Sequence, residues 1–160
     1  MQLAHYRVHN CLVSTYESAN HAAFKHGRTE TIRSATSQAL NFVELMNDDS
    51  ATNEAKAAAM REAISNHGKI TKDALMGQGI DRLLFGLRKL AEEEGAAPEE
   101  LPRIFNTEAH AIFEKIVIST STLASPNLVG GGFGPVNDIC YAFGYGLTDE
   151  QVRRVHCYHT

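Results

Sequence analysis

The feature that most restricts the fold is a long helical stretch in the middle of the chain, with strand-like runs on both sides of it. Residues 53–94 are rich in helix-forming residues, and Gly77-Gln78-Gly79 interrupts them, so they predict two helices. Runs rich in β-branched and aromatic residues predict strands at 11–18, 28–33, 115–121, 139–145 and 151–158. Because 160 residues is the usual size of one domain, the pattern predicts a single α/β domain.

Two shorter helices are expected before the central stretch. Residues 2–9 have the pattern of the end of a helix, and residues 36–46 predict a helix that begins with Thr36 or Ser37 as its cap. The second of the two central helices carries Leu83, Leu87 and Leu90 at helical spacing, which places them on one face. Residues 95–102 predict a loop.

Composition excludes several classes of function. The formal net charge is −4 with an isoelectric point near 6.0, and the basic residues form no stripe, so nucleic acid is not an expected partner. Cys11, Cys140 and Cys157 form no Cys-x-x-Cys pair, which argues against a disulfide framework and a thiolate zinc site. His5 and His9 are spaced like metal ligands on a helix but lack the glutamate of such a motif, so no metal site is predicted.

No segment of the sequence has the pattern of a membrane span or a targeting peptide. A helix needs about 20 apolar residues to cross a bilayer, and no run approaches that length. The first ten residues, MQLAHYRVHN, lack the arginine- and serine-rich character of a transit peptide.

Four blocks of sequence, in a fixed order, carry a resemblance to a known family. They are Tyr16-Glu17-Ser18 with AAFKHGRTETIRS (22–34), ITKDALMGQGIDRLLFGLRKLA (70–91), STSTLASPN (119–127) and GGFGPV (131–136). Together they resemble the choline/carnitine acyltransferase family. The resemblance implies the fold of the coenzyme A-dependent, chloramphenicol acetyltransferase-like acyltransferases, with a mixed sheet and covering helices. Residues 1–160 are expected to form an incomplete C-terminal domain, with the N-terminal catalytic half absent.

The resemblance implies transfer of an acyl group between coenzyme A and the hydroxyl of carnitine. Carnitine and acyl-coenzyme A are therefore the expected partners, with the thioester as co-substrate, no permanently bound cofactor and no obligate protein partner. The general-base histidine is expected in the N-terminal half, so no catalytic base is predicted here. The nearest strings, at His26 (HGRTE) and His110 (HAIFE), have glutamate where the wider superfamily has aspartate, and a structural role is favoured for both histidines.

By resemblance, Tyr16, Ser18, Thr29 and Arg82 would bind carnitine, with Thr31 nearby. A guanidinium suits this task because its planar fork gives a carboxylate two charge-assisted hydrogen bonds. In relatives that use choline, which has no carboxylate, apolar or amide residues replace Thr29, Thr31 and Arg82. The alternative for Arg82 is a surface charge paired with Asp81.

Two further positions gain a role from the resemblance. Ser121 would support the oxyanion of the tetrahedral intermediate, although capping of a strand is an alternative for this hydroxyl. Gly131 and Gly132 would leave an acyl tunnel open, and a tight turn is a compatible reason for glycine there.

The spacing of serines, threonines and glycines in these blocks is most similar to the branch of the family that transfers long, palmitoyl-type chains. That branch implies fatty acid metabolism at the matrix side of the mitochondrial inner membrane, with peripheral membrane association of the full-length parent. The chain by itself is expected to be inactive. A short- or medium-chain carnitine acyltransferase and a non-enzymatic carnitine-binding remnant or interaction subunit are the alternatives.

Overall fold

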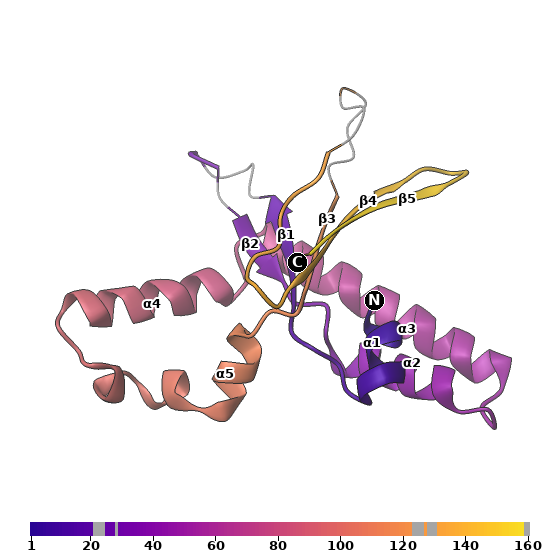
Figure 1. The fold of residues 1–160 in the computed structure, drawn as a ribbon, viewed down its shortest axis with the longest axis horizontal. Helices are drawn as coiled ribbons and strands as arrows, with labels where there is room; N and C mark the ends of the chain where they lie inside the picture. Colours follow the sequence, from indigo (N-terminus) through magenta and orange to yellow (C-terminus); the bar gives the residue numbers. More distant parts are fainter. Residues whose placement is uncertain (21–24, 28, 123–126, 128–130, 159–160) are drawn as a thin grey trace.

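A five-stranded mixed sheet lies at the centre of the computed structural model (Figure 1). Its order is β2-β1-β3-β4-β5; the β1–β3 and β3–β4 pairs are parallel, and the two edge pairs are antiparallel. The strands are β1 (Thr15–Asn20), β2 (Thr29–Ile32), β3 (Ile118–Thr122), β4 (Tyr141–Leu147) and β5 (Val152–Cys157). The structure describes residues 1–160 except 21–24, 28, 123–126, 128–130 and 159–160.

The helices form two groups on either side of the sheet (Figure 1). The helices are α1 (Gln2–His9), α2 (Ser37–Asn47), α3 (Asn53–Leu75), α4 (Asp81–Glu93) and α5 (Glu108–Glu114). In Figure 1, α1, α2 and α3 lie together, whereas α4 and α5 form a separate arm with the 3-10 turns Pro98–Glu100 and Arg103–Asn106 between them. The prediction of an α/β fold with a mixed sheet is confirmed.

Local sequence signals set most of the helix boundaries. The Thr36 hydroxyl accepts a hydrogen bond from the Ala39 N–H at 3.2 Å, and so caps α2. Thr52 caps α3 in the same way, through the Ala55 N–H at 3.2 Å. After α3 the chain turns at Gly77, whose φ of 74° favours glycine, so the predicted break between the two central helices is confirmed.

The largest differences from the sequence prediction are the start of the first strand and one helix. The first strand was expected from residue 11 but begins at Thr15, because the Gln2 side chain holds Val13 through two hydrogen bonds, from its amide to the Val13 carbonyl and from the Val13 N–H. No helix was predicted at 108–114, where α5 forms. Thr107 caps it by accepting from the His110 N–H at 3.1 Å, a local signal that the short length of the helix obscures.

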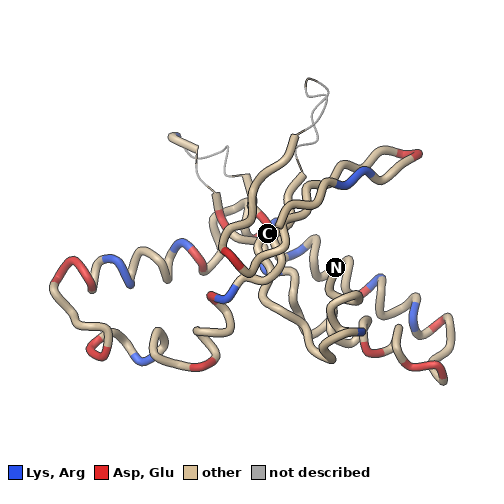
Figure 2. Tube along the Cα trace, viewed as in Figure 1, with Lys and Arg blue, Asp and Glu red and all other residues tan. Residues whose placement is uncertain are grey.

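The core lies where α3 packs on the first two strands. Ala19 and Ile32 meet Ala74 there, with Ile70 at its edge. In contrast, the predicted apolar face of α4 stays uncovered in the described structure, since Leu83, Leu87 and Leu90 are 59%, 49% and 57% exposed. None of the helices in the described ranges is long and apolar enough to cross a bilayer. Figure 2 shows charges of both signs interspersed along α3 and α4.

A polar cluster joins three neighbouring strands. The Glu17 carboxylate accepts hydrogen bonds from the Tyr145 hydroxyl at 2.6 Å and from the Thr120 hydroxyl at 3.0 Å. Burial, together with the hydrogen bond to Glu17 and its charge, raises the pKa of Tyr145 above its ordinary value of 10.0. The hydroxyl therefore stays protonated and continues to donate.

We expect Tyr145→Phe to lower the free energy of unfolding by about 1.5 to 3 kcal/mol, the range for a hydrogen bond to a charged group. The control is Tyr141→Phe on the same strand, which removes the hydroxyl of a side chain that is 54% exposed and should change stability by less than about 0.5 kcal/mol. Urea unfolding at pH 7 measures both. Equal losses would contradict a special role for this cluster.

The raised pKa also predicts a dependence on alkaline pH. A proton held more tightly in the folded state contributes stability below pH 10, and this stability is lost as the pH rises above that value. The free energy of unfolding should therefore fall more steeply above pH 10 in the wild type than in Tyr145→Phe.

Candidate functional site

Six hydroxyl-bearing residues lie on one face of the sheet. Residues opposite one another in paired strands share a face, because side chains alternate along each strand. The register pairs Tyr16 with Ser119, and Ser18 with Thr31, and it places Ser121 opposite Gly144. This face therefore carries Tyr16, Ser18, Thr29, Thr31, Ser119 and Ser121.

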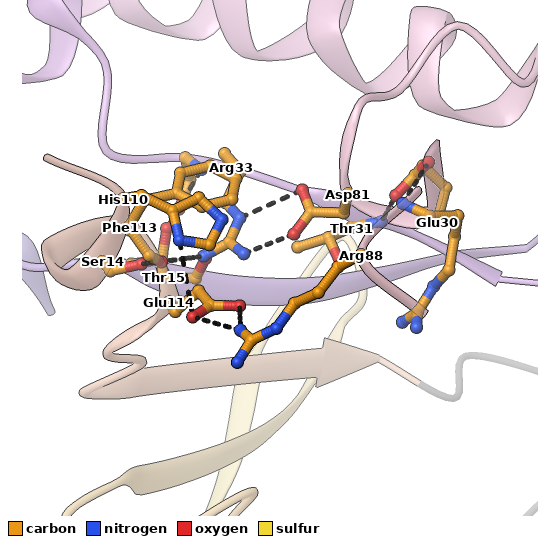
Figure 3. A network of polar contacts seen from close by, with 12 residues as sticks. Ser14, Thr15, Glu30, Thr31, Arg33, Asp81, Arg88, His110, Phe113 and Glu114 are labelled. Carbon is orange, nitrogen blue, oxygen red and sulfur yellow. Dashed lines mark hydrogen bonds and ion pairs between the residues drawn. The ribbon is translucent and has the colours of Figure 1, made fainter. Parts of the chain in front are cut away.

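The first turn of α4 is held beside this face by an ion pair with Arg33, the residue after β2. The Arg33 guanidinium donates through two nitrogens to the two carboxylate oxygens of Asp81, and both side chains are largely buried, at 20% and 13% exposure. Arg33 also donates to the Ser14 hydroxyl at 2.8 Å and lies 3.9 Å from the centre of the Phe113 ring (Figure 3). One side chain thus connects β2, α4 and the end of α5.

A cavity of about 200 Å³ opens between α4, α5 and the sheet. Of the predicted carnitine ligands, Tyr16 and Arg82 line it, with Thr31 beside them. The other lining residues are Arg33, Asp81, Leu84, Phe85, Arg88, Phe105, His110, Phe113, Glu114 and Ile116. Its size suits a small metabolite rather than a drug-sized ligand, for which about 300 to 1,000 Å³ is usual.

The three arginines that line the cavity differ in how their charges are balanced. Arg33 is paired with Asp81, and Arg88 with Glu92 and with both oxygens of Glu114, each 3.2 Å away. Within the described ranges, the Arg82 guanidinium has no carboxylate within 4.0 Å. The alternative pairing of Arg82 with Asp81 is therefore wrong, because Asp81 binds Arg33. Arg82 is left as the cation available to an anionic ligand.

The remaining predicted residues lie outside this cavity. Ser18 and Thr29 are on the same sheet face, but the Thr29 hydroxyl donates to the Ala19 carbonyl at 3.0 Å. Ser121 is half-buried on β3, next to Gly144 of β4. The backbone of Gly131 and Gly132 passes over Gly144. A Cβ added at Gly144 would lie 3.7 Å from the Gly131 carbonyl oxygen and 4.0 Å from the Gly132 Cα.

Comparisons with known proteins agree with the resemblance in the sequence blocks. The family model described as Choline/Carnitine o-acyltransferase matches residues 1–160. The chain belongs to the choline/carnitine acyltransferase family. It is 39% identical over 153 residues to "Carnitine O-palmitoyltransferase 2, mitochondrial" of Xenopus tropicalis. The matched region covers 94% of this chain and 23% of that protein.

Other relatives have different names and similar coverage. "Choline O-acetyltransferase" of Gallus gallus is 37% identical over 95% of this chain and 24% of its own length. "Putative mitochondrial carnitine O-acetyltransferase" of Saccharomyces cerevisiae is 34% identical over 94% of this chain and 22% of its own. The chain thus spans less than a quarter of the length of these family members.

Sequence reasoning gave no site role to two residues that the fold brings to this region. Ser119 is fully buried, and its hydroxyl has no hydrogen-bond partner among the described residues. His110 lines the cavity, with its Nδ1 3.5 Å from a carboxylate oxygen of Glu114. Ser119 could have been found by its two-residue spacing from Ser121, which puts both on one strand face. His110 had no such signal, because α5 was not predicted.

Replacing Arg33 by methionine should lower the free energy of unfolding by about 3 kcal/mol, because it leaves the largely buried Asp81 carboxylate without its partner. The matched control is Arg88→Met. The acidic partners of Arg88, Glu92 and Glu114, are 34% and 50% exposed, so these ion pairs should contribute less than about 1 kcal/mol. Urea unfolding of both variants measures the difference. Equal losses would show that the Arg33 pair is no stronger than a surface pair.

Proposed function

We propose that this chain supplies the carnitine-binding part of a carnitine O-acyltransferase of the palmitoyltransferase type. The complete enzyme would move a long acyl group reversibly between coenzyme A and the carnitine hydroxyl, in fatty acid metabolism in the mitochondrion. The observation that carries the proposal is the unpaired Arg82 guanidinium in a cavity shared with Tyr16 and Thr31. Membership of the family and the names of the relatives support the reaction class.

The chemistry of carnitine explains why this cavity suits it. Its carboxylate needs a cation and hydroxyl donors, which Arg82 and Tyr16 supply at the cavity wall. Its trimethylammonium group is attracted to aromatic faces, and Phe85, Phe105 and Phe113 line the same cavity. One small site therefore offers partners for both ends of a zwitterion.

Ser121 and the two glycines would act in the complete enzyme. Ser121 lies two residues beyond Ser119 on β3, at the height of Gly144, where its hydroxyl could donate to a developing oxyanion. Gly131 and Gly132 present no side chains over Gly144, and a Cβ added at Gly132 would meet no described atom within 4 Å. That open space supports a path for a long acyl chain.

A choline-specific site is the competing function within the family, since one relative is named "Choline O-acetyltransferase". Choline carries the trimethylammonium group but no carboxylate, so a bare guanidinium would repel it rather than bind it. The unpaired charge of Arg82 favours carnitine.

The first test is calorimetric titration of the chain with carnitine and with choline. We expect carnitine to bind more tightly than choline, and Arg82→Asn to weaken carnitine binding by about 2 to 5 kcal/mol, because the carboxylate loses its cation. Arg103→Asn is the control, since Arg103 is an exposed arginine of the same arm that does not line the cavity. Equal carnitine affinities of wild type and Arg82→Asn would refute the proposal.

The second test is turnover. Purified chain mixed with palmitoyl-coenzyme A and carnitine should release no free thiol, because the general base, usually worth a factor of about 100 to 10,000, is expected in other polypeptide. A version extended by the catalytic half of the parent should release thiol, and Ser121→Ala in that version should be slower. Turnover by the 160-residue chain alone would contradict the expected position of the base.

A further inference from the structure

The Glu30 side chain makes an unusual contact for a carboxylate on a strand. It is only 3% exposed, and its two oxygens accept hydrogen bonds from two backbone groups. One oxygen binds the N–H of Thr31 at 2.7 Å, and the other binds the N–H of Arg82 at 3.3 Å. Thr31 and Arg82 both line the cavity, so one buried carboxylate is bonded to the backbone of two cavity residues. Figure 3 shows Glu30 beside Thr31.

This contact replaces the local cap that α4 lacks. The first N–H groups of a helix have no partner within the helix, and negative charge near them is favourable. Ile80, at the cap position of α4, offers no side-chain hydrogen bond. The carboxylate of Glu30, from a strand 52 residues earlier, binds one of these N–H groups instead.

Gly79 provides the space that the Glu30 side chain fills. A Cβ added at Gly79 would lie 2.2 Å from the Glu30 Cγ and 2.5 Å from its Cδ, closer than real atoms approach. Gly79 is not among the described glycines with positive φ, which are Gly27, Gly77 and Gly95. The backbone would therefore accept alanine at 79, and the three nearest atoms that oppose it all belong to Glu30.

We propose that Glu30 is a positioning residue: its buried carboxylate, seated against Gly79, holds the first turn of α4 against β2 so that Arg82 projects into the cavity beside Tyr16 and Thr31. The carboxylate acts through the backbone and does not touch the ligand. What Arg82 binds rests on the proposed function, whereas the placement of Arg82 by Glu30 does not.

A double-mutant cycle tests this pairing. The variants are Glu30→Ala, Gly79→Ala and the two combined, because each single change removes the same seated carboxylate by a different route. The first readout is the hydrogen-exchange rate of the Arg82 amide, measured by NMR. The second is the carnitine dissociation constant of the 160-residue chain.

Each single variant should speed exchange of the Arg82 amide and weaken carnitine binding by about 10- to 100-fold, the loss expected when a binding group is misplaced by about 1 Å. The combined variant should be no worse than Glu30→Ala, because Glu30→Ala removes the three atoms that lie nearest to a Cβ at 79. Exchange in the last turns of α4 should stay unchanged, which separates a local effect from general loss of stability.

Two controls complete the experiment. Gly86→Ala lies in the same helix, where an added Cβ meets nothing within 4 Å, and it should leave both readouts unchanged. Glu30→Gln keeps the size of the side chain but turns one acceptor into a donor, so it should give an intermediate effect. Glu30→Gln also replaces Glu30→Ala in the experiment if Glu30→Ala does not fold.

The outcomes separate this inference from the proposed function. Additive effects in the cycle, or unchanged Arg82 exchange in a folded Glu30 variant, would overturn the positioning role. If the wild-type chain does not bind carnitine, the proposed function fails. The hydrogen-exchange rate of the Arg82 amide would still test whether Glu30 positions Arg82.

Discussion

The structure of the candidate site depends on how the start of α4 is attached to the edge of the sheet. Arg33 on the exit from β2 forms a largely buried, two-pronged ion pair with Asp81, the first residue of α4. A planar guanidinium fixes both distance and orientation of a carboxylate, which a lysine could not do. Because Arg33 also contacts Ser14 and the ring of Phe113, the cavity between α4, α5 and the sheet is assembled around this one side chain.

The same pair decides the electrostatics of the cavity. Asp81 neutralises Arg33, and the acidic residues of α4 and α5 neutralise Arg88, so among the described arginines of the cavity wall Arg82 remains without an acidic partner. An unpaired guanidinium at a cavity wall attracts an anion without having to give up an internal partner. Under the proposed function, this charge would favour the carboxylate that carnitine has and choline lacks, and the relatives of the chain include proteins named for each.

The local elements were largely predictable from the sequence, and the reasons are local. Thr36 and the Gly77–Gly79 break act within a few residues, so the start of α2 and the end of α3 follow from the local sequence. The late start of β1 was not predictable, because it depends on Gln2 binding Val13 across 11 residues. α5 was missed because a short helix has too few turns to show a periodic pattern.

For the site, the sequence by itself indicated the family and the residue types that its strands carry. By resemblance, it predicted Tyr16 and Arg82 as carnitine ligands, but it left open whether Arg82 pairs with Asp81 instead. Only the tertiary structure decided that Asp81 binds Arg33 and that Glu30 bonds the α4 backbone beside Gly79. These contacts join positions about 50 residues apart, and periodicity and spacing describe only neighbours along the chain.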